Sequence, residues 1–330
     1  AMGALGITAT TAGSLLGSAS ALASSPTRGG SVIFASNLHG PDDTLDPILG
    51  TSTVDYSRAN AMYNGLIQVW DDMSLHPELA EEWDVNDNAT QYTFKIRKGV
   101  SFHNGGELTA ADVVYSMNRH IAPGSPSSIK SFFSNVTEWK ALDKHTVRLS
   151  LSSPDADMPF KLTQPQAKIV KKNSLDKWGA GTGPYTLDSF QAGVKSVHSR
   201  NDNYWRDTGQ WLDGIEMTAI TDPNARLNAL LAGSVDMITA IQAKHIKKVE
   251  SSGNSVLSIP SGLYGGICCL KNTAPGDNDD LVQGLRYIQD RERIVRKFLK
   301  GQGTVGNDHP INVAYGADHC HELPQIAYDP

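Results

Sequence analysis

His319, Cys320 and His321 carry the side chains that most directly suggest metal chemistry, because imidazole nitrogens and thiolate sulfurs are preferred zinc ligands. In an extended segment, however, successive side chains point in opposite directions, and no second ligand pair has zinc-site spacing. Cys268 and Cys269 are adjacent, and adjacent cysteines rarely bridge each other because the geometry strains the intervening peptide. A bridge from Cys320 to one of them stays open, although three cysteines form no disulfide framework. We expect no metal site and no cofactor.

Hydrolytic enzymes leave recognisable motifs, and this sequence has neither the G-x-S-x-G elbow of serine hydrolases nor an H-E-x-x-H zinc motif. Glu81 and Glu82 are neighbours, so on a helix they would lie on different sides and cannot form an acid–base pair. Two carboxylates that meet only in the folded chain stay open as a mechanism. We therefore assign no catalytic residue and keep a secreted hydrolase as a remote alternative.

The glycine-rich run Gly-Thr-Gly-Pro-Tyr at residues 181–185 is another segment with chemical potential, since such runs can cradle phosphate. It lacks the G-K-[ST] ending of a phosphate-binding loop and the helix start that would aim backbone amides at an anion. Pro184 removes one of those amides outright. The run therefore favours a structural role, as a crossover within the fold.

Apolar and polar residues alternate over residues 92–97, which predicts a half-buried strand. Residues 100–102 predict a second short strand, and His-Asn-Gly-Gly at residues 103–106 predicts a turn. Thr109 is placed as the N-cap of a helix, with Asp112 three residues later as its acidic partner.

The same rules predict further elements along the chain. Residues 136–142 and 145–151 form a strand pair, and residues 256–259 form another strand. Residues 280–299 carry a long helical pattern of apolar positions.

The composition is that of an ordinary globular protein, with 330 residues, 39% of them hydrophobic and 19% charged, enough for two domains with sizeable cores. A net charge of −6 gives no reason to expect nucleic acid or an anionic membrane as partner. Residues 1–25 are small, modestly apolar and uncharged, and Ala21-Leu22-Ala23 fits a signal-peptide cleavage pattern. We therefore expect residues 1–25 to be a signal-peptide remnant and the mature protein to be a periplasmic monomer. The weak hydrophobicity suits export by the twin-arginine route.

Four ordered motifs resemble those of one protein family. They are Arg-Lys-Gly-Val-x-Phe-His-Asn-Gly at residues 97–105 with Thr-Ala-x-Asp-Val at 109–113, Gly-Thr-Gly-Pro-Tyr at 181–185, Arg-Asn-x-x-Tyr-Trp at 200–205 and a helix pattern at 281–295. In these motifs the chain closely resembles the family 5 extracytoplasmic solute-binding proteins, the peptide- and nickel-type receptors of ABC importers. The helix pattern departs from the family where Gln283 and Gly284 replace its usual Arg and Ala.

The resemblance implies an α/β fold, the type II (cluster C) periplasmic-binding-protein fold, with two lobes built on mixed sheets. It implies a discontinuous lobe I at residues 29–55 and 178–260, with a subdomain inserted at residues 56–177. Residues 261–330 would begin lobe II, which we expect to be incomplete because family members are considerably longer. The resemblance also implies a short helix at residues 77–83.

By the same resemblance, the protein is not an enzyme but a receptor that captures a peptide or similar small polar solute between its lobes. It would deliver this solute to the permease subunits of an ABC importer. Nickel chelates, haem, opines and sugars stay open as ligands. The implied ligand contacts are Asn37, Leu38, His39 and Gly40 in the first lobe and Tyr264 and Gly265 near the hinge.

Overall fold

The computed structural model describes residues 27–37, 40–70, 73–174, 180–207, 209–259 and 262–330, so the predicted signal-peptide remnant at residues 1–25 lies outside the described residues. The described residues form two compact units, one before and one after the peptide bond between residues 240 and 241. The expected start of lobe II at residue 261 lies C-terminal to this division and stays a prediction. In the described part of the chain, no helix has both the length and the apolar character needed to span a membrane.

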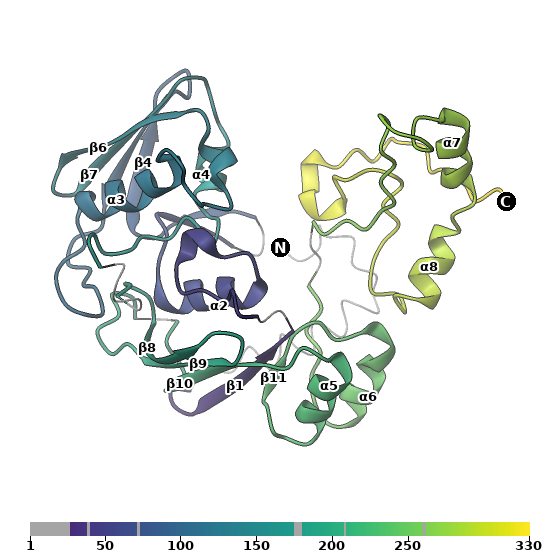
Figure 1. Cartoon of the computed structure of the whole chain (residues 1–330), viewed down its shortest axis with the longest axis horizontal. Helices are drawn as coiled ribbons and strands as arrows, with labels where there is room; N and C mark the ends of the chain where they lie inside the picture. Colours follow the sequence, from purple (N-terminus) through teal and green to yellow (C-terminus); the bar gives the residue numbers. More distant parts are fainter. Residues whose placement is uncertain (1–26, 38–39, 71–72, 175–179, 208, 260–261) are drawn as a thin grey trace. The chain divides into compact units, whose positions relative to one another are not determined.

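The unit at residues 27–240 contains a mixed five-stranded sheet (Figure 1). Its strands are β1 (Ser31–Ser36), β8 (Tyr185–Gln191), β9 (Lys195–Arg200), β10 (Gly214–Ala219) and β11 (Met237–Ile238). They lie in the order β11-β1-β10-β9-β8. β1 runs parallel to both of its neighbours, whereas β8, β9 and β10 pair antiparallel. Ser31 pairs with Gly214, so the sheet joins segments that the sequence separates widely.

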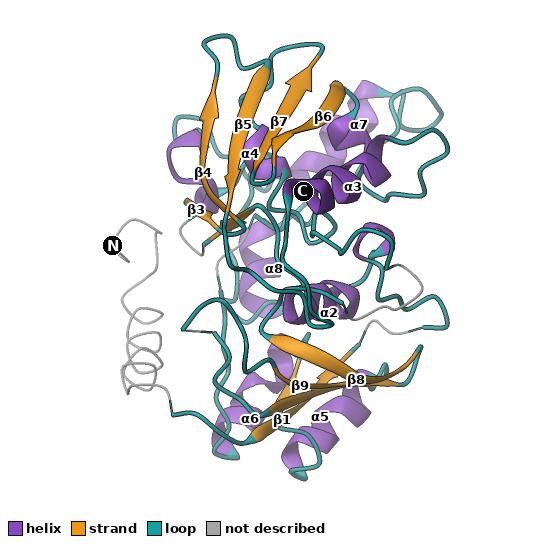
Figure 2. Cartoon of the chain, turned by 90° about the vertical axis from the view of Figure 1, so that its left-hand side faces the viewer, coloured by secondary structure: helices purple, strands orange, loops and turns teal. Residues whose placement is uncertain are grey.

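Two helices cover this sheet. α2 (Thr53–Met62) begins with a capping box, in which the Ser52 hydroxyl accepts from the Asp55 N–H at 3.2 Å and the Asp55 carboxylate accepts from the Ser52 N–H at 3.3 Å. The helix packs on the sheet through a buried cluster of Val54, Ala61, Tyr185 and Met217. α5 (Pro223–Leu231) has Asp222 as its N-cap, and Figure 2 shows it on the sheet face opposite α2.

A second, antiparallel sheet of four strands lies in the same unit, in the order β4-β5-β7-β6. Its strands are β4 (Ala80–Val85), β5 (Gln91–Ile96), β6 (Val136–Asp143) and β7 (Thr146–Leu151). The predicted strands at residues 92–97, 136–142 and 145–151 are thereby confirmed to within a few residues. α3 (Ala110–Ile121) packs on this sheet, and their shared core includes Phe94, Val113, Met117, Val147 and Leu149.

The helix cap predicted for α3 is confirmed. The Asp112 carboxylate accepts from the Thr109 backbone N–H at 2.9 Å and from its hydroxyl at 2.7 Å. The smaller elements of this unit are β2 (Ile67–Val69), β3 (Leu75–Pro77), α4 (Met158–Lys161) and the 3-10 helices η2 (Pro47–Leu49) and η3 (Lys130–Phe133).

Two local predictions in this unit are wrong. The short helix expected at residues 77–83 is largely strand β4, in which Trp83 lies opposite Phe94. Cross-strand packing of two aromatic side chains overrides the modest helix propensity of Ala and Glu there. The strand expected at residues 100–102 is reduced to one isolated bridge between Ser101 and Glu107.

The unit at residues 241–330 consists of short helices and irregular segments. They are η4 (Ala243–His245), α6 (Ile246–Ser251), α7 (Asp279–Tyr287), α8 (Arg291–Lys297) and η5 (Val313–Asp318). The predicted long helix at residues 280–299 is therefore two helices, because Asp290 acts as an N-cap and accepts from the Arg293 N–H at 2.8 Å. Residues 256–259 form no strand, contrary to the prediction.

Candidate functional site

The parallel strands β11, β1 and β10 end at one edge of the five-stranded sheet. In open α/β sheets, ligands bind outside the carboxyl ends of the strands. Asn37, a predicted ligand contact, directly follows β1 at this edge, and Gly40 lies three residues further on. We call this end of the three parallel strands the carboxyl edge and treat it as the candidate site.

Asn37 is half-buried, and its side-chain oxygen accepts a hydrogen bond from the Thr239 hydroxyl at 3.3 Å. Thr239 follows β11, so this bond joins the segments that leave two neighbouring strands. The buried guanidinium of Arg226 on α5 reinforces the edge by donating to the carbonyl oxygens of Ile220 at 2.6 Å and Thr239 at 3.0 Å. Burial lowers the pKa of Arg226, and Asp222 opposes this shift.

Gly40 is held by Asp43. The Asp43 carboxylate accepts from the Gly40 N–H at 2.9 Å, and the Gly40 carbonyl accepts from the Asp43 N–H at 3.1 Å. The same carboxylate accepts from the Gly193 N–H, in the turn between β8 and β9, at 3.2 Å and pairs with the Arg58 guanidinium on α2 at 3.2 Å. Asp43 and Arg58 are not among the predicted contacts, because Arg58 is one of several polar residues on α2 and nothing in the sequence singles it out.

Arg58 is the centre of a buried polar cluster. Besides Asp43, it pairs with Asp55 at 3.5 Å and donates to the Ser196 hydroxyl at 3.2 Å. Burial lowers the pKa of Arg58, and the charges of Asp43 and Asp55 oppose that shift. His198, whose Nε2 lies 2.9 Å from the Ser196 hydroxyl, has its pKa lowered to about 4, first by burial and then by the nearby Arg58 charge.

The other predicted contacts are placed as follows. Leu38 and His39 lie outside the described residues. Tyr264 and Gly265 belong to the unit at residues 241–330, and the Tyr264 side chain is 39% exposed. The Tyr264 ring packs beside Gly306, where an added Cβ would lie 2.8 Å from a ring carbon. Whether these residues contact a ligand stays a prediction.

The glycine-rich run at residues 181–185 lies against the end of α2. An ideal Cβ at Gly181 would be 1.8 Å from the Met62 carbonyl oxygen, and one at Gly183 would be 2.5 Å from the Ala61 carbonyl oxygen. Gly183 also donates its N–H to the Met62 carbonyl at 2.9 Å. The glycines thus permit close approach of two backbone segments, which supports the structural interpretation of this run.

Several of the motifs meet at Asn64, a buried residue after α2. Its side-chain oxygen accepts from the Thr182 hydroxyl at 3.0 Å and from the Trp205 indole N–H at 3.1 Å. Its amide nitrogen donates to the Glu78 carboxylate at 2.8 Å. His103 extends the group, because its Nε2 lies 2.9 Å from the Gly183 carbonyl oxygen. These residues therefore stabilise the fold by joining distant segments of the chain. They are not part of the loop after β1.

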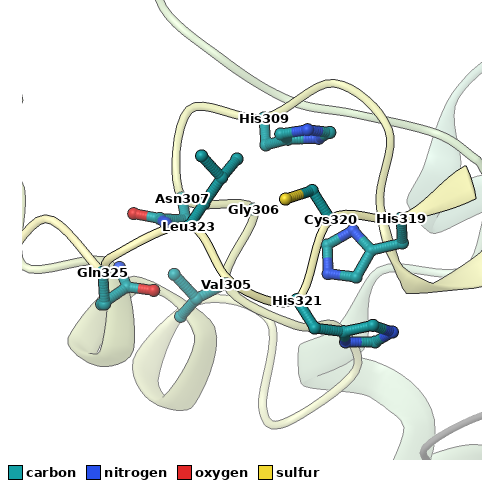
Figure 3. A pocket seen from close by; sticks show the side chains of 9 residues that line it. All are labelled: Val305, Gly306, Asn307, His309, His319, Cys320, His321, Leu323 and Gln325. Carbon is teal, nitrogen blue, oxygen red and sulfur yellow. The ribbon is translucent and has the colours of Figure 1, made fainter.

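The His-Cys-His segment at residues 319–321 lines a hollow in the unit at residues 241–330 (Figure 3). The His319 ring lies edge-on to those of His309, at 5.7 Å, and His321, at 4.6 Å, between centroids. In Figure 3 the His321 ring points away from the Cys320 thiol. Among the described residues, no group of three or more His, Cys, Asp or Glu side chains is placed to hold a metal ion. All three cysteines are free thiols, so the alternative of a Cys320 disulfide is not realised.

Comparison with known proteins gives one family. The family model described as "Bacterial extracellular solute-binding proteins, family 5 Middle" matches residues 74–330. Among curated relatives, the glutathione-binding protein GsiB of Escherichia coli strain K12 is 27% identical over 285 residues, which is 84% of this chain and 56% of GsiB. The chain thus spans little more than half the length of the relatives it matches.

Solved structures show the same fold. The AgaA protein of Agrobacterium tumefaciens R10, in complex with agropinic acid, is 26% identical with a TM-score of 0.69, covering 82% of this chain and 56% of AgaA. NikZ of Campylobacter jejuni, in complex with Ni(L-His), is 21% identical with a TM-score of 0.77, covering 91% of this chain and 60% of NikZ. At 21% identity, the similarity to NikZ supports the fold alone.

Proposed function

Because the chain belongs to family 5 of the bacterial extracellular solute-binding proteins and has the type II periplasmic-binding-protein fold, we propose that it acts in a substrate-binding receptor of an ABC importer. The receptor captures a peptide or similar small polar solute and delivers it to the membrane permease. Family membership over residues 74–330 is the observation that carries this proposal.

The ligand class follows from the relatives. GsiB is named for glutathione, a modified tripeptide. Its match covers 84% of the present chain. AgaA, at 26% identity, was solved with agropinic acid, which favours an opine as the second candidate. Both ligands are small and polar and carry carboxylate groups. A short peptide is therefore the first choice and an opine the alternative.

The carboxyl edge offers groups that suit such a ligand. A side-chain amide such as that of Asn37 has two N–H donors besides its acceptor oxygen, and the Thr239 hydroxyl uses that oxygen. Amide N–H groups can donate to the carbonyl and carboxylate oxygens that peptides and opines both carry. We propose Asn37, Leu38, His39 and Gly40 as contacts at this edge, and Tyr264 and Gly265 as contacts from the unit at residues 241–330.

A receptor of this kind binds and releases its solute without catalysing a reaction. It changes conformation only if the ligand binds one conformation more tightly than another, and a nearly complete shift needs about 5.5 kcal/mol of preference. Tight and reversible capture is then the whole activity, and the solute leaves chemically unchanged. We further propose a periplasmic location, export by the twin-arginine route and a monomeric state.

Isothermal titration calorimetry of the intact protein tests the ligand class. The panel contains reduced glutathione, di- and oligopeptides, agropinic acid and a nickel–histidine complex. Saturable binding of glutathione or a peptide, with the ligand recovered intact, is the expected result. Binding of agropinic acid alone would replace peptide by opine, and steady consumption of any compound would argue for an enzyme.

A further inference from the structure

We propose that Asp43 is a positioning residue for the carboxyl edge: its carboxylate fixes the backbone at Gly40, one of the proposed ligand contacts. This inference rests on the proposed function, and it names a residue that neither the motifs nor the predicted contacts include.

Three elements meet at this one carboxylate. Asp43 accepts from Gly40 in its own turn at 2.9 Å, from Gly193 in the β8–β9 turn at 3.2 Å and from Arg58 on α2 at 3.2 Å. The Asp43 side chain is only 4% exposed, so water competes poorly for these bonds. Asp43 therefore joins Gly40 to the β8–β9 turn and to α2.

Arg58 is itself fixed, which makes it a rigid anchor. Its side chain is 1% exposed, it donates to Ser196 on β9, and its guanidinium lies 5.0 Å from the Phe190 ring centroid on β8. Without Asp43, this buried guanidinium would depend on the longer contact to the Asp55 carboxylate at 3.5 Å, so the pair resists separation. The position of Asp43 is thus set by the sheet rather than by the loop.

The β8–β9 turn closes the arrangement from the other side. Gly193 has φ +71°, and a Cβ added there would lie 3.2 Å from both the carbonyl carbon and the oxygen of Gly40. The turn therefore packs closely against Gly40, and a side chain at Gly193 would crowd the Gly40 carbonyl group. Gly40 is held by a hydrogen bond to Asp43 and by direct contact with this turn.

The functional consequence is preorganisation. A contact residue such as Gly40 that is already held in the free protein loses little freedom when the ligand binds, and this raises affinity without adding a contact. Removing the Asp43 carboxylate should loosen Gly40 and weaken ligand binding, although Asp43 itself need not touch the ligand.

Asp213 is a control beside the start of β1, away from the carboxyl edge. Its carboxylate accepts from the Gly30 N–H at 2.9 Å and pairs with Arg200 at 2.8 Å. Because the Asp213 side chain is 53% exposed, Asp213→Ala controls for loss of a carboxylate that binds backbone near β1, and the buried setting is particular to Asp43.

The test compares Asp43→Ala, Asp43→Asn and Asp213→Ala in the intact protein. Amide hydrogen exchange at Gly40 is measured without ligand, and the Kd for reduced glutathione, or for the best peptide of the panel, is measured by calorimetry. For Asp43→Ala we expect at least about ten-fold faster exchange at Gly40 and about ten-fold weaker binding. Asp43→Asn keeps an acceptor oxygen and should recover part of both effects, whereas Asp213→Ala should change neither.

Unchanged exchange at Gly40 in Asp43→Ala would overturn the proposal, and so would faster exchange with unchanged affinity. If Asp43→Ala does not fold, Asp43→Asn provides the same two readouts, because it keeps the side-chain volume and removes the charge that pairs with Arg58; unchanged exchange and unchanged affinity in that variant would also overturn the proposal. If the wild-type protein binds no compound of the panel, the proposed ligand class fails, and the exchange measurement alone decides whether Asp43 holds Gly40.

Discussion

The indole N–H of Trp205 donates to the side-chain oxygen of Asn64 at 3.1 Å, across 141 positions of sequence. The same oxygen accepts from the Thr182 hydroxyl, so two separate motifs share one buried acceptor. Each of these motifs supplies one donor to this buried network, in which neighbouring hydrogen bonds can strengthen one another.

Asn64→Ala should therefore destabilise the protein by about 2–4 kcal/mol, because it leaves the Thr182 hydroxyl and the Trp205 indole without this acceptor. Urea unfolding measures the loss, and Asn88→Ala, at an exposed turn position, is the control with an expected cost below about 1 kcal/mol. Equal costs for the two variants would show that the network contributes nothing special.

Gly181→Ala should be more damaging still, at about 3 kcal/mol or more, because the new Cβ would lie 1.8 Å from the Met62 carbonyl oxygen and must displace backbone. Gly284→Ala on α7 meets nothing within 4 Å and should instead stabilise its helix by about 0.5–1 kcal/mol. Thermal unfolding of both variants distinguishes them. A Gly181→Ala protein that melts like the wild type would refute the close approach.

Stability should fall on mild acidification. Burial lowers the pKa of His120 and of His198 to about 4, below the ordinary histidine value of about 6.5 in the unfolded chain. The unfolded state therefore binds more protons between these values, so the stabilisation is complete above about pH 6.5 and is lost as the pH falls towards 4. Each residue contributes on the order of 3 kcal/mol.

Urea unfolding between pH 4.5 and 7.5 measures this dependence. His198→Gln should flatten the fall in unfolding free energy, and the double variant with His120→Gln should flatten it further. An identical slope in the wild type and both variants would show that neither imidazole is responsible.

Tyr264 is a predicted ligand contact that can be tested separately. Tyr264→Ala should weaken binding of the calorimetric ligand by roughly ten-fold, in line with loss of one aromatic contact. Tyr287→Ala is the matched control, since both tyrosines are about 40% exposed and lie in the same unit. Equal affinities of the two variants would remove Tyr264 from the site.

Local sequence patterns predicted those elements whose cause is local. The strict alternation before Arg97 gave a strand that the structure contains, and the Thr109–Asp112 spacing gave a helix cap with the expected bonds. The family resemblance implied a helix at Trp83, yet its partner across the sheet, Phe94, decides its conformation.

The candidate site was only partly accessible to such reasoning. Asn37 was identified through the family resemblance, and its position after β1 agrees with where parallel strands place ligands. The Asp43–Arg58 ion pair was not predicted, because nothing in a single sequence links a carboxylate in a loop with a guanidinium on a helix 15 positions later. Pairs of this kind depend on tertiary structure, which brings the β8–β9 turn to the same point.

The most direct test of the account is the affinity of Asn37→Ala for the ligand that the intact wild-type protein binds. We expect a Kd raised by about ten-fold or more, with an unfolding midpoint close to that of the wild type, because Asn37 is only half-buried. Asn88→Ala should bind as the wild type does. An unchanged Kd for Asn37→Ala would contradict the claim that the carboxyl edge beside β1 receives the solute.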